Sequence, residues 1–201
     1  MRKYYYTNSL LLVVIFLFVT ACEGIFVPDP IDPRIPKYTE EGNNVAGAYI
    51  DNNIWESVVK IGYLNVSDQP LFTVDQENNS LLLRFSGSTS RKSSSIEFHL
   101  KGLNISNFGD LVTLKGQNIQ LDGIKNAGYY IENYTPPTYA YKGIGQLYFR
   151  NVRIGNSSSR IILSGTFGFS IHDPNGKIIK VSSGRFDYII SENPNFQLQR
   201  H

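Results

Sequence analysis

Apolar and polar residues alternate with a period of two along most of the chain from Val45 onward. The clearest case is the segment 160–173, whose odd positions from 161 to 171 are apolar or glycine and whose even positions are mostly small or polar. Successive side chains of a strand point to opposite faces, so this order predicts a strand with one face on a core and the other in water. We therefore expect Phe167 and Phe169 in the core, and Thr166 and Ser170 outside.

The same period predicts further strands, which are separated by turn-forming residues. Hairpin turns are predicted at residues 51–53 (Asp-Asn-Asn), 77–79 (Glu-Asn-Asn) and 174–176 (Pro-Asn-Gly). The predicted strands are 45–50, 54–60, 72–76, 80–87, 96–101, 139–151, 160–173, 177–183 and 185–190. Residues 88–95 predict a polar, flexible loop, and residues 107–114 are compatible with a short helix or with a turn.

These short strands and turns predict an all-β fold. After residue 44 the sequence shows no amphipathic helical pattern of ordinary length, and thirteen tyrosines, twelve phenylalanines and seventeen glycines suit strands joined by turns. We expect residues 45–201 to form one antiparallel β-domain built from consecutive hairpins. Both a sandwich and a barrel satisfy this pattern.

The N-terminus has the features of a bacterial lipoprotein signal peptide. Arg2 and Lys3 precede an apolar run at 10–19, and residues 19–22 read Val-Thr-Ala-Cys, which is the order of a lipobox. In this interpretation residues 1–21 are removed and the thiol of Cys22 carries fatty acyl chains that anchor the mature protein in a membrane.

An ordinary secretory signal and a transmembrane helix are the alternatives. The apolar run of ten residues is short for a membrane span, which takes roughly 20 residues. Cys22 is the only cysteine in the chain, so it forms no disulfide within the chain. Lipidation of Cys22 explains both observations.

Residues 22–44 predict a semi-rigid tether between the lipid and the domain. Pro28, Pro30, Pro33 and Pro36 each fix their own φ and favour extended geometry in the preceding residue. In polyproline geometry such a tether holds the domain up to roughly 60 Å from the bilayer. The alternative is that part of the segment packs on the domain as an additional edge strand.

Charge argues against nucleic acid as a partner. The mature chain keeps all seventeen acidic residues but loses Arg2 and Lys3 of the nineteen basic ones, which makes it formally neutral. A basic surface for nucleic acid is therefore not predicted.

Four segments together carry a family resemblance: 47–55 (GAYIDNNIW), 141–149 (YKGIGQLYF), 164–169 (SGTFGF) and 184–187 (GRFD). In this order they resemble the small outer-envelope lipoproteins of Bacteroidota that contain a C-terminal β-domain of unknown function. Ser182 and Ser183 stand where such proteins commonly have threonine. The resemblance implies an envelope location and a β fold, and it implies no catalytic residue.

Motifs for catalysis or metal binding are not found in the sequence. The three histidines, His99, His172 and His201, have no metal-ligand spacing, and His99 and His172 fall on polar strand faces, which predicts solvated side chains. The nucleophile motif Gly-x-Ser-x-Gly is also lacking. We therefore expect no cofactor, no metal and no enzymatic activity.

A cluster of tyrosines in residues 129–148 is the best candidate for a binding surface. Tyr130, Tyr134, Tyr139 and Tyr141 surround a Pro-Pro step at 136–137. Tyrosine combines an apolar ring with a polar tip, which suits contact with sugars or with a protein partner. The alternative is that these rings, like that of Trp55, only pack across strands.

The expected protein is thus a lipid-anchored, non-catalytic binding or accessory component of the bacterial cell envelope. The expected membrane is the outer membrane, and the sequence leaves its periplasmic or surface face open. A glycan-binding module that uses residues 129–148 is the alternative, and an envelope hydrolase is a third. The partners expected are the membrane, through Cys22, and a glycan or an envelope protein.

Overall fold

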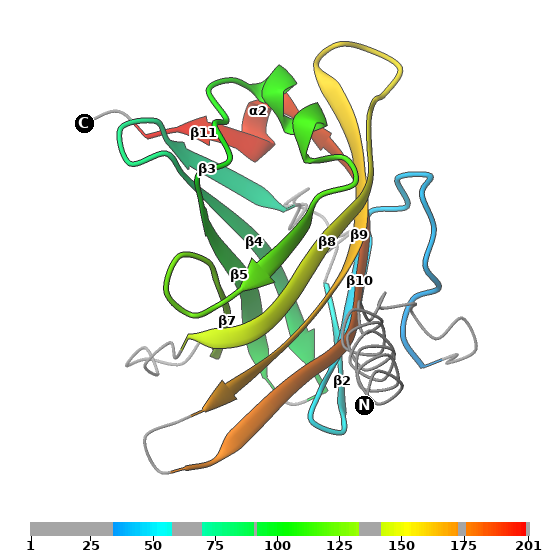
Figure 1. Ribbon diagram of the computed structural model, residues 1–201. Coiled ribbons are helices and arrows are strands. Elements are labelled where there is room, and N and C mark those ends of the chain that lie inside the picture. Colours follow the sequence, from blue (N-terminus) through cyan, green and yellow to red (C-terminus); the bar gives the residue numbers. More distant parts are fainter. Residues whose placement is uncertain (1–33, 58–69, 91, 133–141, 173–175, 200–201) are drawn as a thin grey trace, which may run out of the picture.

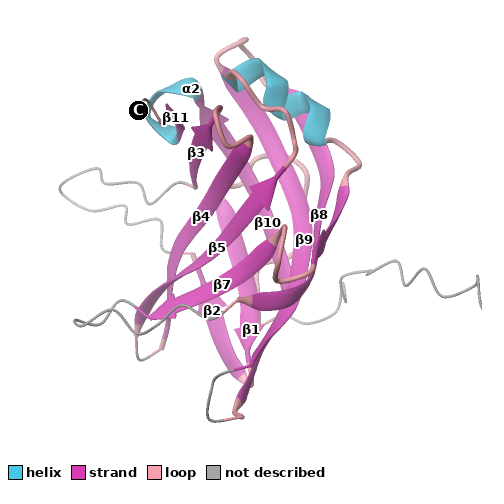
Figure 2. Cartoon of the chain, turned by 60° about the vertical axis from the view of Figure 1, so that its left-hand side comes forward, coloured by secondary structure: helices cyan, strands magenta, loops and turns pink. Residues whose placement is uncertain are grey.

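Eight antiparallel strands pair edge to edge in a ring and close a β-barrel (Figures 1 and 2). The computed structural model describes residues 34–57, 70–90, 92–132, 142–172 and 176–199. The ring consists of β1 (Val45–Ile50), β2 (Asn53–Glu56), β4 (Ser80–Thr89), β5 (Ser93–Lys101), β7 (Ala127–Glu132), β8 (Gly143–Ile154), β9 (Arg160–His172) and β10 (Ile178–Ser191), which pairs with β1. The all-β class is confirmed, and of the two predicted architectures the barrel is the one found.

Three further strands extend the sheet beside the ring by pairing with free edges of its strands. β3 (Leu71–Asp75) forms the predicted hairpin with β4, and β11 (Phe196–Leu198) pairs with β3 in parallel after the short helix α2 (Glu192–Asn195). β6 (Asn118–Leu121) pairs with β8. These additions cover edges that the barrel strands leave unpaired.

Aromatic rings fill the barrel. Phe85 of β4 stacks on Tyr188 of β10 with ring centroids 5.6 Å apart, and Phe98 meets Phe167 edge to face at 5.3 Å. The indole N–H of Trp55, which is fully buried, donates to Ser94 Oγ at 3.0 Å. The prediction that Phe167 and Phe169 belong to the core is confirmed, because their side chains are 1% and 3% exposed. The interior is therefore a packed core.

A 3-10 helix, η1 (Phe108–Leu114), covers one end of this core (Figure 2). Asn107 and Asp110 form a reciprocal capping box at its start, which explains why the backbone turns here. Phe108, Leu111 and Leu114 are buried beneath it. The segment 107–114, for which helix and turn were both compatible, is thus a short helix.

The ring closes between β7 and β8 at a seam that two glycines make possible. Gly128 pairs with Gly143, and it is the only residue pair that joins these two strands in the described chain. A Cβ on Gly143 would lie 2.4 Å from Phe169 Cδ2, and a Cβ on Gly128 would lie 2.8 Å from Phe169 Cδ1. The ring of Phe169 thus lies against both glycines, and only glycine leaves room for it.

Two predicted interruptions of strands are wrong. The segments 177–183 and 185–190 are one strand, β10, which bends at a bulge where Ser183 adopts a φ of 51° instead of ending. The segment 88–95 is mostly strand, because β4 continues to Thr89 and β5 begins at Ser93. Polar residues there were misleading, because Ser94 is fully buried, where it accepts the Trp55 indole N–H, and Ser95 is only 5% exposed. The predicted strand ends at 58–60 and 139–141 lie outside the described residues.

Residues 34–44, which we call the N-terminal strap, pack against the outer face of the barrel. The carboxylate of Asp187 on β10 accepts hydrogen bonds from the Thr39 hydroxyl and from the backbone N–H groups of Glu41, Gly42 and Asn43. Pro36 crosses β1 so closely that a Cβ on Gly47 would lie 2.4 Å from Pro36 Cδ. This end of the proline-rich segment is therefore in contact with the barrel and forms no strand.

The outer face of β9 is more deeply covered than the alternation predicts. Thr166 points away from the core, as the alternation requires, yet its residue is only 2% exposed, and Ser164 beside it is fully buried. The expectation that Thr166 lies in water is therefore wrong. Ser170, further along the same face, is partly exposed. The alternation correctly identified the outer face of β9, but it carried no information about what covers that face.

Candidate functional site

A hollow lies at the barrel end opposite η1, which we call the open end. It has a volume of about 200 Å³ and opens between the β1–β2 turn, the β4–β5 turn, the end of β7 and the start of β10. Its lining consists of Ile50, Asp51, Asn53, Thr89, Ser90, Lys92, Tyr130, Glu132, Lys177 and Ile179. A second hollow of about 370 Å³ adjoins it and shares Asn53, Thr89 and Ser90.

The β1–β2 turn holds one carboxylate at the rim of the hollow. Asp51 has a φ of 53°, which the tight turn requires and which aspartate tolerates better than most residues. Its backbone N–H donates to the Lys180 carbonyl at 2.7 Å, and Lys180 N–H donates to Asp51 Oδ1 at 2.9 Å. These two bonds fix the turn to β10, and they thereby hold the Asp51 carboxylate in place.

Tyr130 supplies the aromatic surface of the hollow. It lies on β7 opposite Ile96, is partly buried, and packs against the core. Burial raises the pKa of the Tyr130 phenol, and the nearby negative charge of Glu132 raises it further. The phenol therefore stays neutral near pH 7 and is able both to donate and to accept a hydrogen bond.

An ion pair borders the hollow on the side of the β4–β5 turn. Lys92 Nζ lies 2.6 Å from Glu132 Oε2, and both side chains are partly exposed. Such a surface pair adds little to stability, on the order of 0.2–1 kcal/mol. It does fix the positions of one positive and one negative group beside Tyr130.

This set of side chains suits a small polyhydroxylated ligand. Amide, hydroxyl and carboxylate groups from separate turns converge beside one aromatic ring, so hydroxyl groups would find both donors and acceptors and an apolar ring face would find Tyr130. The hollow is smaller than the roughly 300–1,000 Å³ usual for drug-sized ligands. It therefore fits one small unit of a larger ligand better than a whole one.

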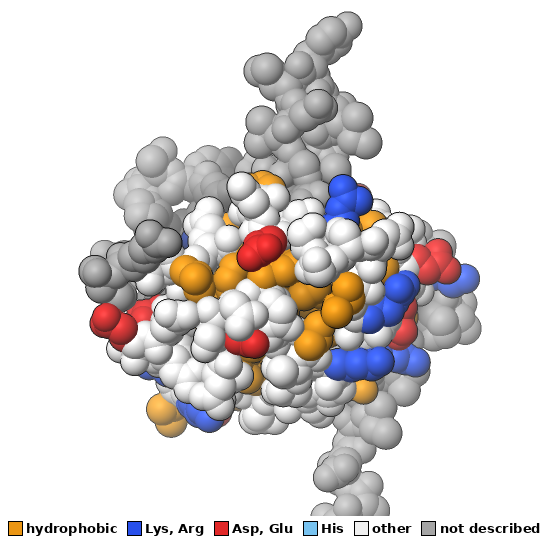
Figure 3. Space-filling model, turned by 90° about the horizontal axis from the view of Figure 1, so that it is seen from above, with side chains coloured by type: hydrophobic (Ala, Val, Ile, Leu, Met, Phe, Trp, Pro, Cys, Tyr) orange, Lys and Arg blue, Asp and Glu red, His pale blue; other side chains and the backbone are white. Residues whose placement is uncertain are grey.

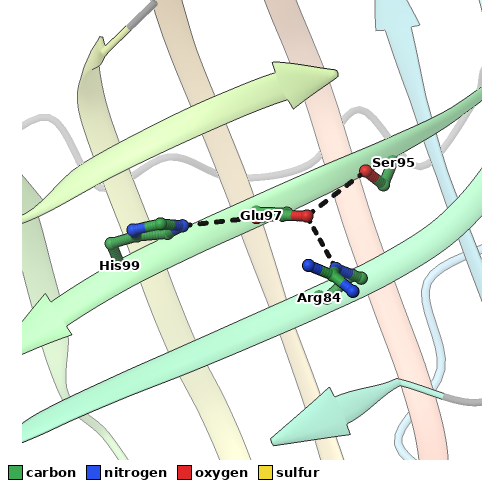
Figure 4. Close-up of polar contacts among 4 residues, drawn as sticks. All are labelled: Arg84, Ser95, Glu97 and His99. Carbon is green, nitrogen blue, oxygen red and sulfur yellow. Dashed lines mark hydrogen bonds and ion pairs between the residues drawn. The ribbon is translucent and has the colours of Figure 1, made fainter. Parts of the chain in front are cut away.

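A second polar cluster lies on the outer wall of the barrel (Figure 4). The backbone register places Arg84, Glu97 and Tyr129 side by side on β4, β5 and β7. Arg84 Nε donates to Glu97 Oε1 at 2.6 Å, and His99 Nε2 lies 3.2 Å from Glu97 Oε2. The His99 ring in turn contacts the ring of Tyr129, with centroids 4.4 Å apart.

Glu97 keeps its charge in this cluster although its side chain is only 6% exposed. Burial alone would raise the pKa of the Glu97 carboxyl, but the hydrogen bond with His99 and the charge of Arg84 outweigh burial and lower it. His99 was expected as a solvated histidine, and this expectation is wrong in part: its side chain is half exposed but bonded to Glu97. A fixed His–Glu pair can hold a proton at a defined atom. A nucleophilic serine would complete a catalytic triad, but no serine hydroxyl is bonded to His99 in the described chain.

Only one of the residues predicted to form a site lies in the described part of the chain. Tyr130 lines the hollow, whereas Tyr134, Tyr139, Tyr141 and the predicted lipidation site Cys22 lie outside the described residues. Sequence reasoning missed the turn residues that line the hollow from β1–β2 and β4–β5. The predicted turns did carry a signal, because alternate turns of an antiparallel barrel lie at the same end. This signal identifies neighbouring turns only once the strand order is known.

The described residues offer neither a metal cluster nor a membrane-spanning helix. No group of three or more histidine, cysteine, aspartate or glutamate side chains in these ranges is placed to hold a metal ion. No helix in the described part of the chain is long and apolar enough to cross a membrane. Comparison with known proteins adds no relative: no family model matches the chain, and no significant match is found among curated proteins or solved structures.

Proposed function

We propose that this protein is a lipid-anchored component of a bacterial cell envelope, located on the outer membrane, and that its barrel binds a glycan at the open end without catalysis. One observation carries the binding role: Tyr130, Asp51, Asn53 and Glu132 line the same hollow. Because aromatic rings fill the barrel interior, the ends and the outer wall are the surfaces left for a ligand. The resemblance to Bacteroidota envelope lipoproteins supports the location.

The anchor is supported by the lipobox that ends at Cys22. Mass spectrometry of the mature N-terminus tests it directly. The expected product begins at an acylated Cys22, and Cys22→Ala yields a precursor that is neither cut nor acylated. A mature chain that begins elsewhere, or an unmodified Cys22, would contradict the anchor.

Binding is tested with two tyrosines of one strand. Tyr130 lines the hollow and its neighbour Tyr129 faces the outer wall, so Tyr130→Leu and Tyr129→Leu remove equal ring area from opposite sides of β7. On a glycan array we expect Tyr130→Leu and Asn53→Ala to lose binding while Tyr129→Leu retains it. Thermal unfolding of each variant separates a lost site from a lost fold. Equal loss in both tyrosine variants would assign these rings to packing.

The two carboxylates in the hollow favour a hydrolase as the second candidate. Asp51 of the β1–β2 turn and Glu132 of β7 approach one space, as a glycosidase requires of its acid and its base or nucleophile. Incubation of the protein with envelope polysaccharide, followed by an assay for new reducing ends, tests this candidate. Activity that disappears in both Asp51→Asn and Glu132→Gln would replace the non-catalytic proposal.

A further inference from the structure

The N-terminal strap joins the barrel wall in the half nearest the open end. The guanidinium of Arg34 lies 5.1 Å from the centre of the Tyr49 ring, and Tyr49 directly precedes Ile50 and Asp51 of the hollow. From there the strap runs toward the η1 end, where Asn44 Oδ1 accepts a hydrogen bond from Ile189 N–H at 3.0 Å (Figure 1). Residue 34 thus lies on the side of the barrel wall where the hollow opens.

The chain between the proposed anchor and this point is short. Residues 23–33 separate Cys22 from Arg34, and fully extended they span on the order of 40 Å. The barrel strands β8–β10 have 12, 13 and 14 residues. At about 3.3 Å per residue and a tilt near 40°, they place the η1 end about 35 Å further along the barrel. Contact of the η1 end with the bilayer would therefore need an almost fully extended tether, whereas contact of the open end would not.

The rim of the open end has the chemistry of a membrane-facing surface on its β8–β10 side. Lys142, Lys177 and Lys180 are exposed there, together with Ile144 (55% exposed) and Ile178 (47%). The register sets Ile144 in one row with Ser170 and Lys180, so one apolar and one basic side chain lie on either side of Ser170. The described stretches 142–148 and 176–182 contain no acidic residue.

We infer that this rim, residues Lys142, Ile144, Lys177, Ile178 and Lys180, docks on the anionic surface of the bilayer that holds the anchor, with the hollow opening toward the lipid head groups. The inference rests on the proposed lipidation of Cys22. Each lysine close to an anionic leaflet gains roughly fivefold in membrane affinity, and the two isoleucines enter the interfacial region. The lipid attaches the protein to the membrane, and the rim sets the orientation of the barrel. The hollow therefore meets its ligand at the membrane surface.

The single natural cysteine makes the orientation measurable. In the lipidated protein Cys22 is acylated, so Ile178→Cys and Ile154→Cys each introduce one free thiol for a fluorescent label. Ile154, which is 59% exposed at the end of β8 near η1, is the matched control for Ile178 at the open end. Figure 3 shows that the η1 end has an apolar band of its own, so both ends must be labelled.

Each labelled protein is reconstituted in vesicles of phosphatidylcholine with phosphatidylglycerol that contain a lipid-borne quencher. We expect strong quenching at position 178 and little at position 154. Quenching at 178 should weaken severalfold in vesicles without phosphatidylglycerol, and likewise when Lys142→Gln and Lys180→Gln are combined. Thermal unfolding of the double variant checks that the fold is kept.

Three outcomes would overturn the inference. Quenching at 154 instead of 178, or at neither position, in protein that mass spectrometry shows to be lipidated refutes the orientation and leaves the anchor intact. A label at 178 that is shielded in detergent, in a protein that elutes as a dimer, assigns the rim to a contact between copies. An unmodified Cys22 refutes the anchor, and the inference fails with it.

Discussion

Asp187 and Gly42 lie 145 residues apart in the chain and are joined by a buried hydrogen bond of 2.7 Å, in which Gly42 N–H donates to Asp187 Oδ1. Three further donors of the strap share this carboxylate. Asp187 itself is only 1% exposed. One side chain of β10 thus fixes the path of the segment that precedes the barrel.

Loss of this carboxylate should therefore destabilise the protein. Asp187→Ala leaves four donors without their acceptor, and we expect the free energy of unfolding in urea to fall by on the order of 3 kcal/mol. Asp187→Asn, which keeps one acceptor oxygen, should fall by less. Lys37→Ala, an exposed change on the same strap, should stay within about 0.5 kcal/mol. If Asp187→Ala behaves like Lys37→Ala, the strap contributes nothing to stability and the fold begins at residue 45.

The glycines at the barrel seam should not tolerate a side chain. Gly143→Ala forces a Cβ to within 2.4 Å of the Phe169 ring, so we expect a loss of about 1–3 kcal/mol in the free energy of unfolding. Gly168→Ala is the matched control, because its nearest neighbour would be a carbonyl oxygen at an ordinary 3.5 Å. It should be neutral, or more stable by up to about 1 kcal/mol. Phe169→Leu should relieve part of the Gly143→Ala loss, and strictly additive effects would show that the two residues do not meet.

The two faces of β9 should respond differently to substitution. Phe167→Ala should cost roughly 3–5 kcal/mol, as large-to-small changes in cores do, and Ser170→Ala about 0.5 kcal/mol or less. Thr166 belongs to neither class, because its hydroxyl is buried without a hydrogen-bond partner among the described residues. Thr166→Val keeps the shape and removes the polar atom, so it should stabilise by on the order of 1 kcal/mol. A destabilised Thr166→Val would show that the hydroxyl has a partner.

Stability should depend on pH through Glu97. Its pKa in the folded protein lies below the ordinary value of 4.5, so its charge stabilises the fold above that pH, and the contribution is lost as the pH falls through the folded pKa. Between about pH 7 and about pH 3 the wild type should therefore lose more stability than Glu97→Gln. Urea denaturation at each pH measures the difference.

Arg84→Leu provides the control for this explanation. Without the guanidinium, burial weighs more heavily on Glu97, and the acid loss should begin at a higher pH than in the wild type. Parallel pH curves for the wild type and Glu97→Gln would contradict the role of Glu97.

The sequence predicted the local part of this structure and not the long-range part. The alternation in β9 identified Phe167 and Phe169 as core because the side-chain period of a strand is a local property. Barrel closure depends on Phe169 fitting over Gly128 and Gly143, three residues that no local pattern connects. Thr166 was misplaced for the same reason, since the burial of its outward side is not a local property of the strand.

The candidate site shows the same limit. Tyr130 was identified as one of a run of tyrosines, and it does line the hollow. Asp51 and Asn53 were seen only as turn formers, because their position beside Tyr130 follows from the ring order of the strands. The bond between Glu97 and His99 lies between residues i and i+2 of one strand face, and a search of such pairs would have found it.

The contacts of the strap have a mechanical consequence if, as proposed, the protein is attached to a membrane at Cys22. Along the chain, a pull on the tether first meets the contact of Pro36 with Gly47 and the four bonds at Asp187, and only then Val45, where β1 begins. Those bonds pass the load to β10, which is held by β1 on one side and β9 on the other. The force therefore acts on β10, which is paired along both edges. It does not separate β1 from the barrel one residue at a time from its N-terminal end.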